Sequence, residues 1–244
     1  MPTVITNILT FRRLASAYLA ETKTLSFDEA HARRAYWASE LIHSFGIEWT
    51  IENPEALYIG KPCIYVANHT CALDPIVMCC IFDRDVRFLA KSTLFKIPLL
   101  SRALKLEKHI PVYRGTHDQA RFERLKASVH DTIADGGSVF IFPEGTRSAT
   151  GKMGEFKLGA FFNAIQNDVP VVPILLRGLF EIMPKTTLRI KPGQCYVRVL
   201  PAMSAPDADL FQNEHQRAQQ FSQNVRQAMV DGFATWKNEG NDNG

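Results

Sequence analysis

Short apolar segments that alternate with helical patterns constrain the fold of this chain most. Five such segments read as buried strands, because they are apolar throughout and are bounded by turn or helix signals. They span residues 63–67, 86–90, 109–112, 138–142 and 171–175. Between them, helical signals cover residues 75–82, 98–106 and 117–134. Strands that alternate with helices in this way predict an α/β layer fold.

Two further β-prone runs lie nearer the carboxyl end. Residues 187–190 and 195–200 flank Lys191, Pro192 and Gly193, which form a turn signal. We expect a hairpin here, followed by a last helix from about residue 212 to 236. The expected architecture is therefore a mixed, largely parallel central sheet flanked by helices.

The first 46 residues predict two helices instead. In the first helix the apolar residues fall on one side, namely Val4, Ile5, Ile8, Leu9, Phe11, Ala15, Tyr18 and Leu19. The second helix opens with a capping-box pattern at Ser26 and Glu29 and ends at Gly46. The stripe of the first helix fits a membrane interface and the protein's own core equally well. We therefore divide the chain into an amphipathic two-helix unit at 1–46, an α/β domain at 47–237 and a flexible tail at 238–244.

Composition narrows the class of protein. Hydrophobic residues make up 46% of the 244 residues and charged residues 22%, which is typical of a globular protein. The longest run without Asp, Glu, Lys or Arg covers only residues 62–73, far short of the ~18 apolar residues that a membrane span needs. Five cysteines form an odd number without paired spacing, and no secretory leader is evident. We therefore expect no transmembrane helix, and free thiols in a reducing compartment.

Positive charge is concentrated in one part of the chain. The net charge is only +3, yet residues 84–126 hold eleven Lys or Arg against four Asp or Glu. This basic belt fits phosphate groups, anionic lipid, an acidic carrier protein or nucleic acid, and it also fits an ordinary solvated surface.

The first candidate for chemistry follows the strand at 63–67. His69 and Asp74 lie five positions apart, so within one continuous helix they would be roughly 140° apart around the axis. They meet only if the chain turns between them and a helix begins near Asp74, which Pro75 favours. Asp74 would then fix the tautomer of the His69 imidazole, and the other ring nitrogen would take a proton from a hydroxyl. A strand-end histidine beside a helix-capping aspartate is the plain structural alternative.

The second candidate, residues 142–148, follows the strand at 138–142. Its polar and small residues are Glu144, Gly145, Thr146 and Arg147. Glycine lets the backbone approach a ligand, the glutamate and threonine can bond hydroxyls, and the arginine offers a planar fork for phosphate. A plain turn is the alternative.

Two cations complete the candidate site. Lys91 and Arg114 each lie just past an expected strand. Ligands of open α/β sheets collect outside the carboxyl ends of strands, so both cations converge with His69 if the strands are parallel neighbours. A single surface cation is, by itself, more often only solvated.

In this order the residues resemble the 1-acylglycerol-3-phosphate acyltransferases of the glycerolipid acyltransferase superfamily. His69 and Asp74 match the first sequence block of that family. The second block resembles residues 111–115, which include Arg114, and the third matches residues 142–148 residue for residue. Residues 171–174 resemble the fourth, hydrophobic block, and residues 90–91 and 156–159 resemble other segments usual in the family. Cys71 departs from the small hydroxyl residue that is frequent at its position.

The resemblance implies an O-acyltransferase of phospholipid biosynthesis. Such an enzyme moves a fatty acyl group from acyl-CoA or acyl carrier protein to the sn-2 hydroxyl of 1-acyl-sn-glycerol 3-phosphate and forms phosphatidic acid. His69 would be the general base and Asp74 its orienting partner, without a covalent intermediate. The residues expected to bind the substrate phosphate and glycerol are Lys91, Arg114, Glu144, Gly145, Thr146 and Arg147.

The same resemblance implies a peripheral location on the cytoplasmic side of the membrane. It implies no cofactor beyond the acyl donor and no nucleic-acid partner, and the absence of a Cys-x-x-Cys pair argues against a zinc site. Three alternatives stay open. They are an acyltransferase with another acceptor, such as glycerol 3-phosphate or a lyso-aminolipid, a lipid-binding module without turnover, and a hydrolase.

Overall fold

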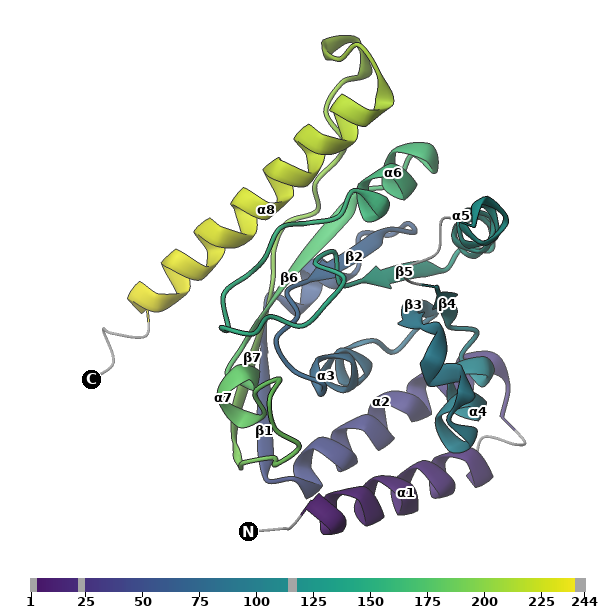
Figure 1. Cartoon of the computed structure of the whole chain (residues 1–244), viewed down its shortest axis with the longest axis vertical. Coiled ribbons are helices and arrows are strands. Elements are labelled where there is room, and N and C mark those ends of the chain that lie inside the picture. The colour runs from purple at the N-terminus through teal and green to yellow at the C-terminus, as the bar shows by residue number, and fades with distance from the viewer. Residues whose placement is uncertain (1–3, 22–24, 114–117, 240–244) are drawn as a thin grey trace.

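One seven-stranded sheet forms the centre of the molecule (Figure 1). The computed structural model describes residues 4–21, 25–113 and 118–239. The strands are β1 (Ile47–Glu52), β2 (Ile64–Ala67), β3 (Val86–Lys91), β4 (Ile110–Val112), β5 (Ser138–Ile141), β6 (Val171–Arg177) and β7 (Gly193–Val199). Their order is β1-β7-β6-β2-β5-β3-β4, and every neighbouring pair is parallel except β6 and β7. The expectation of a mixed, largely parallel sheet is confirmed.

Helices cover both faces of this sheet. They are α1 (Val4–Glu21), α2 (Phe27–Ser44), α3 (Asp74–Ile81), α4 (Pro98–Leu106), α5 (Gln119–Ala134), α6 (Gly159–Gln166), α7 (Leu179–Ile182) and α8 (Glu214–Glu239). Short 3₁₀ turns are η1 (Pro54–Leu57), η2 (Ser92–Lys96) and η3 (Ala208–Leu210). Helices α1 to α4 lie on one side of the sheet, and α5, α6 and α8 lie on the other (Figure 1). The five strands expected from apolar runs are all present.

Burial on both faces explains why the strands read as continuous apolar runs. In β2, Tyr65 and Ala67 join the core cluster under α2 and α3, whereas Ile64 and Val66 join the cluster under α5, α6 and α8. All four side chains are buried. A strand covered on both faces has no solvated side that would require polar residues.

The N-terminal helices pack onto this body. The capping box of α2 forms as expected, with Ser26 Oγ accepting the Glu29 amide and Glu29 Oε2 accepting the Ser26 amide. In α1, Phe11 and Leu14 pack against the core, whereas Leu9 is 58% exposed. The described part of the α1 stripe therefore docks mainly on the protein itself. Within the described residues, no helix combines the length and apolar character needed to cross a bilayer.

Two local expectations about strands fail. Residues 187–190 form no strand, and the expected hairpin is wrong: β7 lies between β1 and β6, so both of its edges are already paired. Strand β1 was not expected, although its apolar residues alternate with polar ones at a period of two. At the carboxyl end α8 runs to Glu239, so it covers the first two residues of the expected tail, and residues 240–244 lie outside the described part.

Candidate active site

The predicted site residues that the structure describes lie past the carboxyl ends of neighbouring parallel strands. His69 comes two residues after β2, and Glu144 comes three residues after β5. Strands β2 and β5 pair with Val66 opposite Ile141, so the same register brings His69 level with Glu144. The topology therefore delivers the first and third sequence blocks to one edge of the sheet.

His69 and Asp74 are in direct contact. His69 Nδ1 lies 2.7 Å from Asp74 Oδ2, and the same oxygen accepts the amides of Thr70 at 2.7 Å and Cys71 at 2.9 Å. Asp74 is the first residue of α3, whose N-cap is Leu73, and its side chain points back into the preceding loop. The aspartate therefore does not act as the helix cap of the plain alternative, and it holds the turn that brings His69 to it.

Burial and stacking fix this pair. The Asp74 side chain is fully buried, which raises its pKa, while the contact with His69 and the two loop amides lower it. The imidazole stacks on the Phe142 ring with centroids 4.0 Å apart and planes inclined by 17°. The carboxylate oxygen is an acceptor, so Nδ1 carries the proton and Nε2 is the ring atom left to accept one.

Residues 142–148 wrap around the His69 backbone. Gly145 has φ +69°, a conformation that suits glycine, and its amide donates to the Phe142 carbonyl in a tight turn. Glu144 Oε1 accepts the His69 amide at 2.7 Å, and the Ser148 amide donates to the His69 carbonyl at 2.7 Å. The sequence places Glu144 near glycerol oxygens, yet in the structure its other oxygen, Oε2, accepts the Gly154 amide at 2.8 Å.

Two lysines that the sequence did not single out lie beside this loop. The Lys185 ammonium donates to the Arg147 carbonyl at 3.0 Å and lies 3.4 Å from Thr146 Oγ1. The end of the Lys157 side chain crosses Gly145, with atoms 3.0 to 3.1 Å from where a Cβ would lie. Lys157 belongs to the segment 156–159 noted above, but Lys185 follows α7 in an irregular stretch without a periodic signal.

Two further cations, Lys91 and Arg114, were predicted to join the site. Lys91 ends β3 and is exposed, two strands away from β2 and so about 10 Å across the sheet. Arg114 lies outside the described residues, so its place in the site stays a prediction. Among the described residues, no group of three or more His, Cys, Asp or Glu side chains is placed to hold a metal ion.

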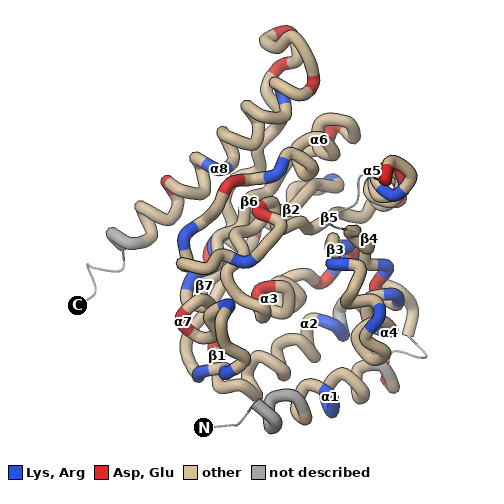
Figure 2. The backbone as a smooth tube through the Cα atoms, in the orientation of Figure 1, with Lys and Arg blue, Asp and Glu red and all other residues tan. Residues whose placement is uncertain are grey.

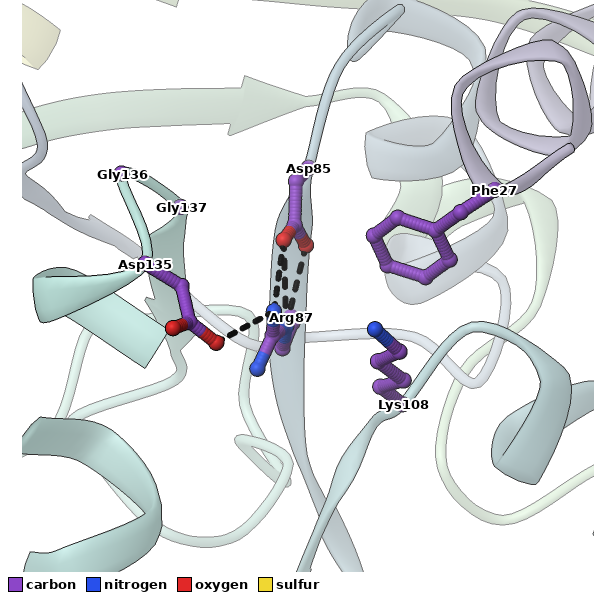
Figure 3. Close-up of a pocket in the computed structure, with 7 residues that line it drawn as sticks. All are labelled: Phe27, Asp85, Arg87, Lys108, Asp135, Gly136 and Gly137. Carbon is purple, nitrogen blue, oxygen red and sulfur yellow. Dashed lines mark hydrogen bonds and ion pairs between the residues drawn. The ribbon is translucent and has the colours of Figure 1, made fainter. Parts of the chain in front are cut away.

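A pocket of about 480 Å³ lies elsewhere, at the amino ends of β3 and β5 (Figure 3). Its charged lining residues are Asp85, Arg87, Lys108 and Asp135. Figure 3 shows the arginine between the two carboxylates, which it contacts at 2.8 Å and 3.6 Å, and the Lys108 ammonium lies over the Phe27 ring. These charges satisfy one another. The pocket also opens at the opposite edge of the sheet from His69, so we do not assign it to the candidate site.

Comparisons with known proteins identify related sequences and a related fold. Residues 48–177, more than half of the chain, match the family model described as acyltransferase. This range includes His69, Asp74 and the loop 142–148. A solved structure, the 1-acyl-sn-glycerophosphate acyltransferase PlsC from Thermotoga maritima, matches with a TM-score of 0.71 at 19% identity, covering 93% of this chain and 96% of that one. At this identity the likeness shows the fold.

Two plant relatives carry the same name. The chain is 38% identical over 149 residues to the chloroplastic 1-acyl-sn-glycerol-3-phosphate acyltransferase of Brassica napus, which covers 61% of this chain and 42% of that protein. It is 34% identical over 180 residues to the chloroplastic enzyme of the same name from Arabidopsis thaliana, with coverages of 73% and 49%. The matched part thus spans less than half the length of either relative. With the family model matched across the strands that carry the site, the chain belongs to the acyltransferase family.

Proposed function

We propose that this protein is an O-acyltransferase that moves a fatty acyl group from a thioester to the sn-2 hydroxyl of 1-acyl-sn-glycerol 3-phosphate. The product would be phosphatidic acid, and the donor would be acyl-CoA or acyl carrier protein. The observation that carries the proposal is the contact of His69 Nδ1 with the buried Asp74 carboxylate at 2.7 Å. The names of the matched relatives support the choice of acceptor.

The chemistry follows from the orientation of the imidazole. Nε2 takes the proton from the acceptor hydroxyl while that oxygen attacks the thioester carbonyl carbon. The C–S bond then breaks, the acyl group stays on the new ester oxygen, and the proton passes from the imidazolium to the leaving thiolate. Asp74 stabilises the transient positive charge on His69. The thioester is already activated, so the reaction proceeds in one transfer and needs no acyl-enzyme.

Cations beside the third block supply the phosphate site of this proposal. Lys157 and Lys185 lie beside Gly145 and Thr146, in the same loop as Arg147, and within the described residues no ion pair joins these three side chains to a carboxylate. Cations that lack protein counterions can neutralise an acceptor phosphate. The Arg147–Ser148 peptide group links the Lys185 cation to the His69 backbone, because its carbonyl accepts from Lys185 and its amide donates to the His69 carbonyl. Lys91 and Arg114 would extend the site.

The charge distribution supports a peripheral membrane location on the cytoplasmic side. Lys91, Lys96, Arg102 and Lys105 are exposed, and residues 86–106 contain no Asp or Glu. Lys91 ends β3, Lys96 lies in η2, and Arg102 and Lys105 lie on α4, which packs against α1; Figure 2 shows blue segments along α4. Ile97, next to Lys96 in the chain, is exposed, and Leu9 on α1 is exposed too. Basic residues around exposed apolar ones suit the surface of an anionic bilayer.

An acceptor panel tests the proposed activity. The purified protein is incubated with one acyl donor and, in separate reactions, lysophosphatidate, glycerol 3-phosphate, lysophosphatidylethanolamine or no acceptor, and the lipid products are weighed by mass spectrometry. We expect phosphatidic acid from lysophosphatidate as the main product. Faster acylation of another acceptor would reassign the substrate, and release of free fatty acid without acceptor would indicate a hydrolase.

The variant His69→Ala separates a catalyst from a lipid-binding module. Loss of a general base should lower the rate at least ~100-fold while lysophosphatidate binding survives. His215→Ala, which changes an exposed histidine on α8, is the control. A His69→Ala protein with the wild-type rate would contradict the mechanism. Running the panel with acyl-CoA and with acyl carrier protein identifies the donor.

A further inference from the structure

We propose that Glu144 is a positioning residue that holds the backbone of His69, and that it does not bind the acceptor. The inference rests on the proposed acyl transfer, because it concerns the base of that reaction. It differs from the role near the glycerol oxygens that the sequence pattern suggests.

The contacts of the carboxylate carry the inference. Glu144 is buried, with 7% of its surface exposed, and each of its oxygens accepts a backbone amide. Oε1 takes the His69 amide at 2.7 Å and Oε2 takes the Gly154 amide at 2.8 Å. Bonds from an amide to an ionised carboxylate are about twice as strong as neutral ones. Burial raises the pKa of Glu144, and these two amides lower it, so they favour the ionised form that accepts both bonds.

His69 is consequently held at every polar backbone group. Its amide donates to Glu144, and its carbonyl accepts the Ser148 amide. Its ring bonds Asp74 and stacks on Phe142. The loop 142–148 thus supports the main chain of the base, while Asp74 orients its ring. Catalysis is sensitive to such support, because small displacements of a reacting group lower the rate steeply.

Gly154 provides an independent way to disturb this support. A Cβ at residue 154 would lie 3.1 Å from Glu144 Oε2, whereas its next nearest atoms would be 3.9 Å away. The backbone of Gly154 does not occupy the left-handed region. An alanine there therefore presses on the Glu144 carboxylate without removing it and without straining the main chain.

The experiment compares two variants with two controls. Glu144→Gln leaves an amide group facing one backbone donor, and Gly154→Ala displaces the carboxylate. The controls are Glu155→Gln, which changes a neighbouring side chain that is 92% exposed, and Gly159→Ala, where a Cβ meets no atom within 4 Å. For each protein we would measure kcat, KM for lysophosphatidate and the thermal midpoint.

The expected result is a split between the two kinetic constants. In Glu144→Gln kcat should fall at least ~10-fold, and in Gly154→Ala at least ~3-fold, while KM stays within ~3-fold of wild type. Both controls should stay within ~2-fold in both constants. If Glu144→Gln does not fold, Gly154→Ala carries the test.

Two outcomes would overturn the inference. One is a KM raised at least ~10-fold in Glu144→Gln with kcat near wild type, since that pattern marks a ligand of the substrate. The other is a Gly154→Ala protein that behaves like Gly159→Ala. Failure of the proposed function is separate, because it would show as a wild-type protein that does not acylate lysophosphatidate.

Discussion

At the scale of single residues, Asp74 offers the sharpest test of the reaction. One of its oxygens accepts two amides and contacts the His69 ring. Asparagine keeps the size and an accepting oxygen but has no charge to stabilise an imidazolium. We expect Asp74→Asn to lower kcat about 10²- to 10⁴-fold with little change in KM, measured by steady-state kinetics. The exposed Asp209→Asn is the control, and a raised KM with normal kcat would argue against this role.

Cys71 lies next to this pair, where its amide donates to Asp74 Oδ2, and its thiol is a competing nucleophile. Burial, together with the nearby Asp74 charge, raises the pKa of its thiol to about 12, so the thiol is protonated at neutral pH. Its sulfur accepts the Leu73 amide at 3.3 Å, a bond that a serine hydroxyl can replace. We expect Cys71→Ser to keep kcat within ~3-fold of wild type and to show no burst in rapid-quench kinetics. A burst in the wild type that the variant lacks would favour an acyl-enzyme.

The residues of the site were predictable to unequal degrees. His69 and Asp74 were predictable because a short loop between a strand and a proline-marked helix start leaves few arrangements. The contacts of Glu144 were not, because its partner amides belong to residues 75 positions before it and ten after it. Lys185 gave no signal, since an isolated lysine in an irregular stretch looks like any solvated cation.

At the scale of helices, a buried charge cluster ties α1, α2 and α4 together. Glu107, at the end of α4, accepts bonds from the Tyr18 hydroxyl and from Arg34 Nη1 at 2.8 Å. His31 Nε2 lies 3.1 Å from the same carboxylate, and Glu107 is only 3% exposed. Burial alone would raise the pKa of Glu107, but His31, Arg34 and Tyr18 outweigh it and hold the pKa below its ordinary value.

This lowered pKa makes the stability of the fold depend on pH with a definite sign. The ionised Glu107 stabilises the folded state at neutral pH, and its contribution is lost as the pH falls below the ordinary range of a glutamate. We expect Glu107→Gln to lower the free energy of unfolding by about 3 kcal/mol at pH 7, because the buried Arg34 loses its partner. Urea denaturation from pH 7 down to 3 measures the difference, which should shrink toward the acidic end. The exposed Glu55→Gln is the control, and a difference that stays constant with pH would contradict the assignment.

Local signals predicted elements better than pairings. The capping box at Ser26 and the apolar runs act within a few residues, so they were visible in the sequence. The hairpin failed because β7 takes its partners from β1, nearly 150 residues earlier, and from β6. Distant parts of the chain decide which segment pairs with a given strand edge. Residues 187–190, which do not pair, therefore carry no local signal of that outcome.

At the scale of the whole molecule, the uneven charge predicts how the protein meets a bilayer. We expect it to sediment with vesicles that contain anionic phospholipid, more weakly with pure phosphatidylcholine, and at least ~5-fold less at 0.5 M salt. Replacing Lys96, Arg102 and Lys105 by glutamine should reduce binding, whereas replacing Lys152 and Lys191 should not. If neither salt nor the triple replacement changes vesicle binding, the membrane proposal loses its electrostatic basis.

The hydrogen bonds between the loop 142–148 and the His69 backbone also determine when the site can form during biosynthesis. His69 emerges from the ribosome early. The groups that hold its backbone emerge some eighty residues later, and they are Glu144, Ser148 and Gly154. Strand β6, which pairs with β2 beside the base, follows later still. A nascent chain can therefore expose its N-terminal helices to a lipid surface well before it can perform chemistry there.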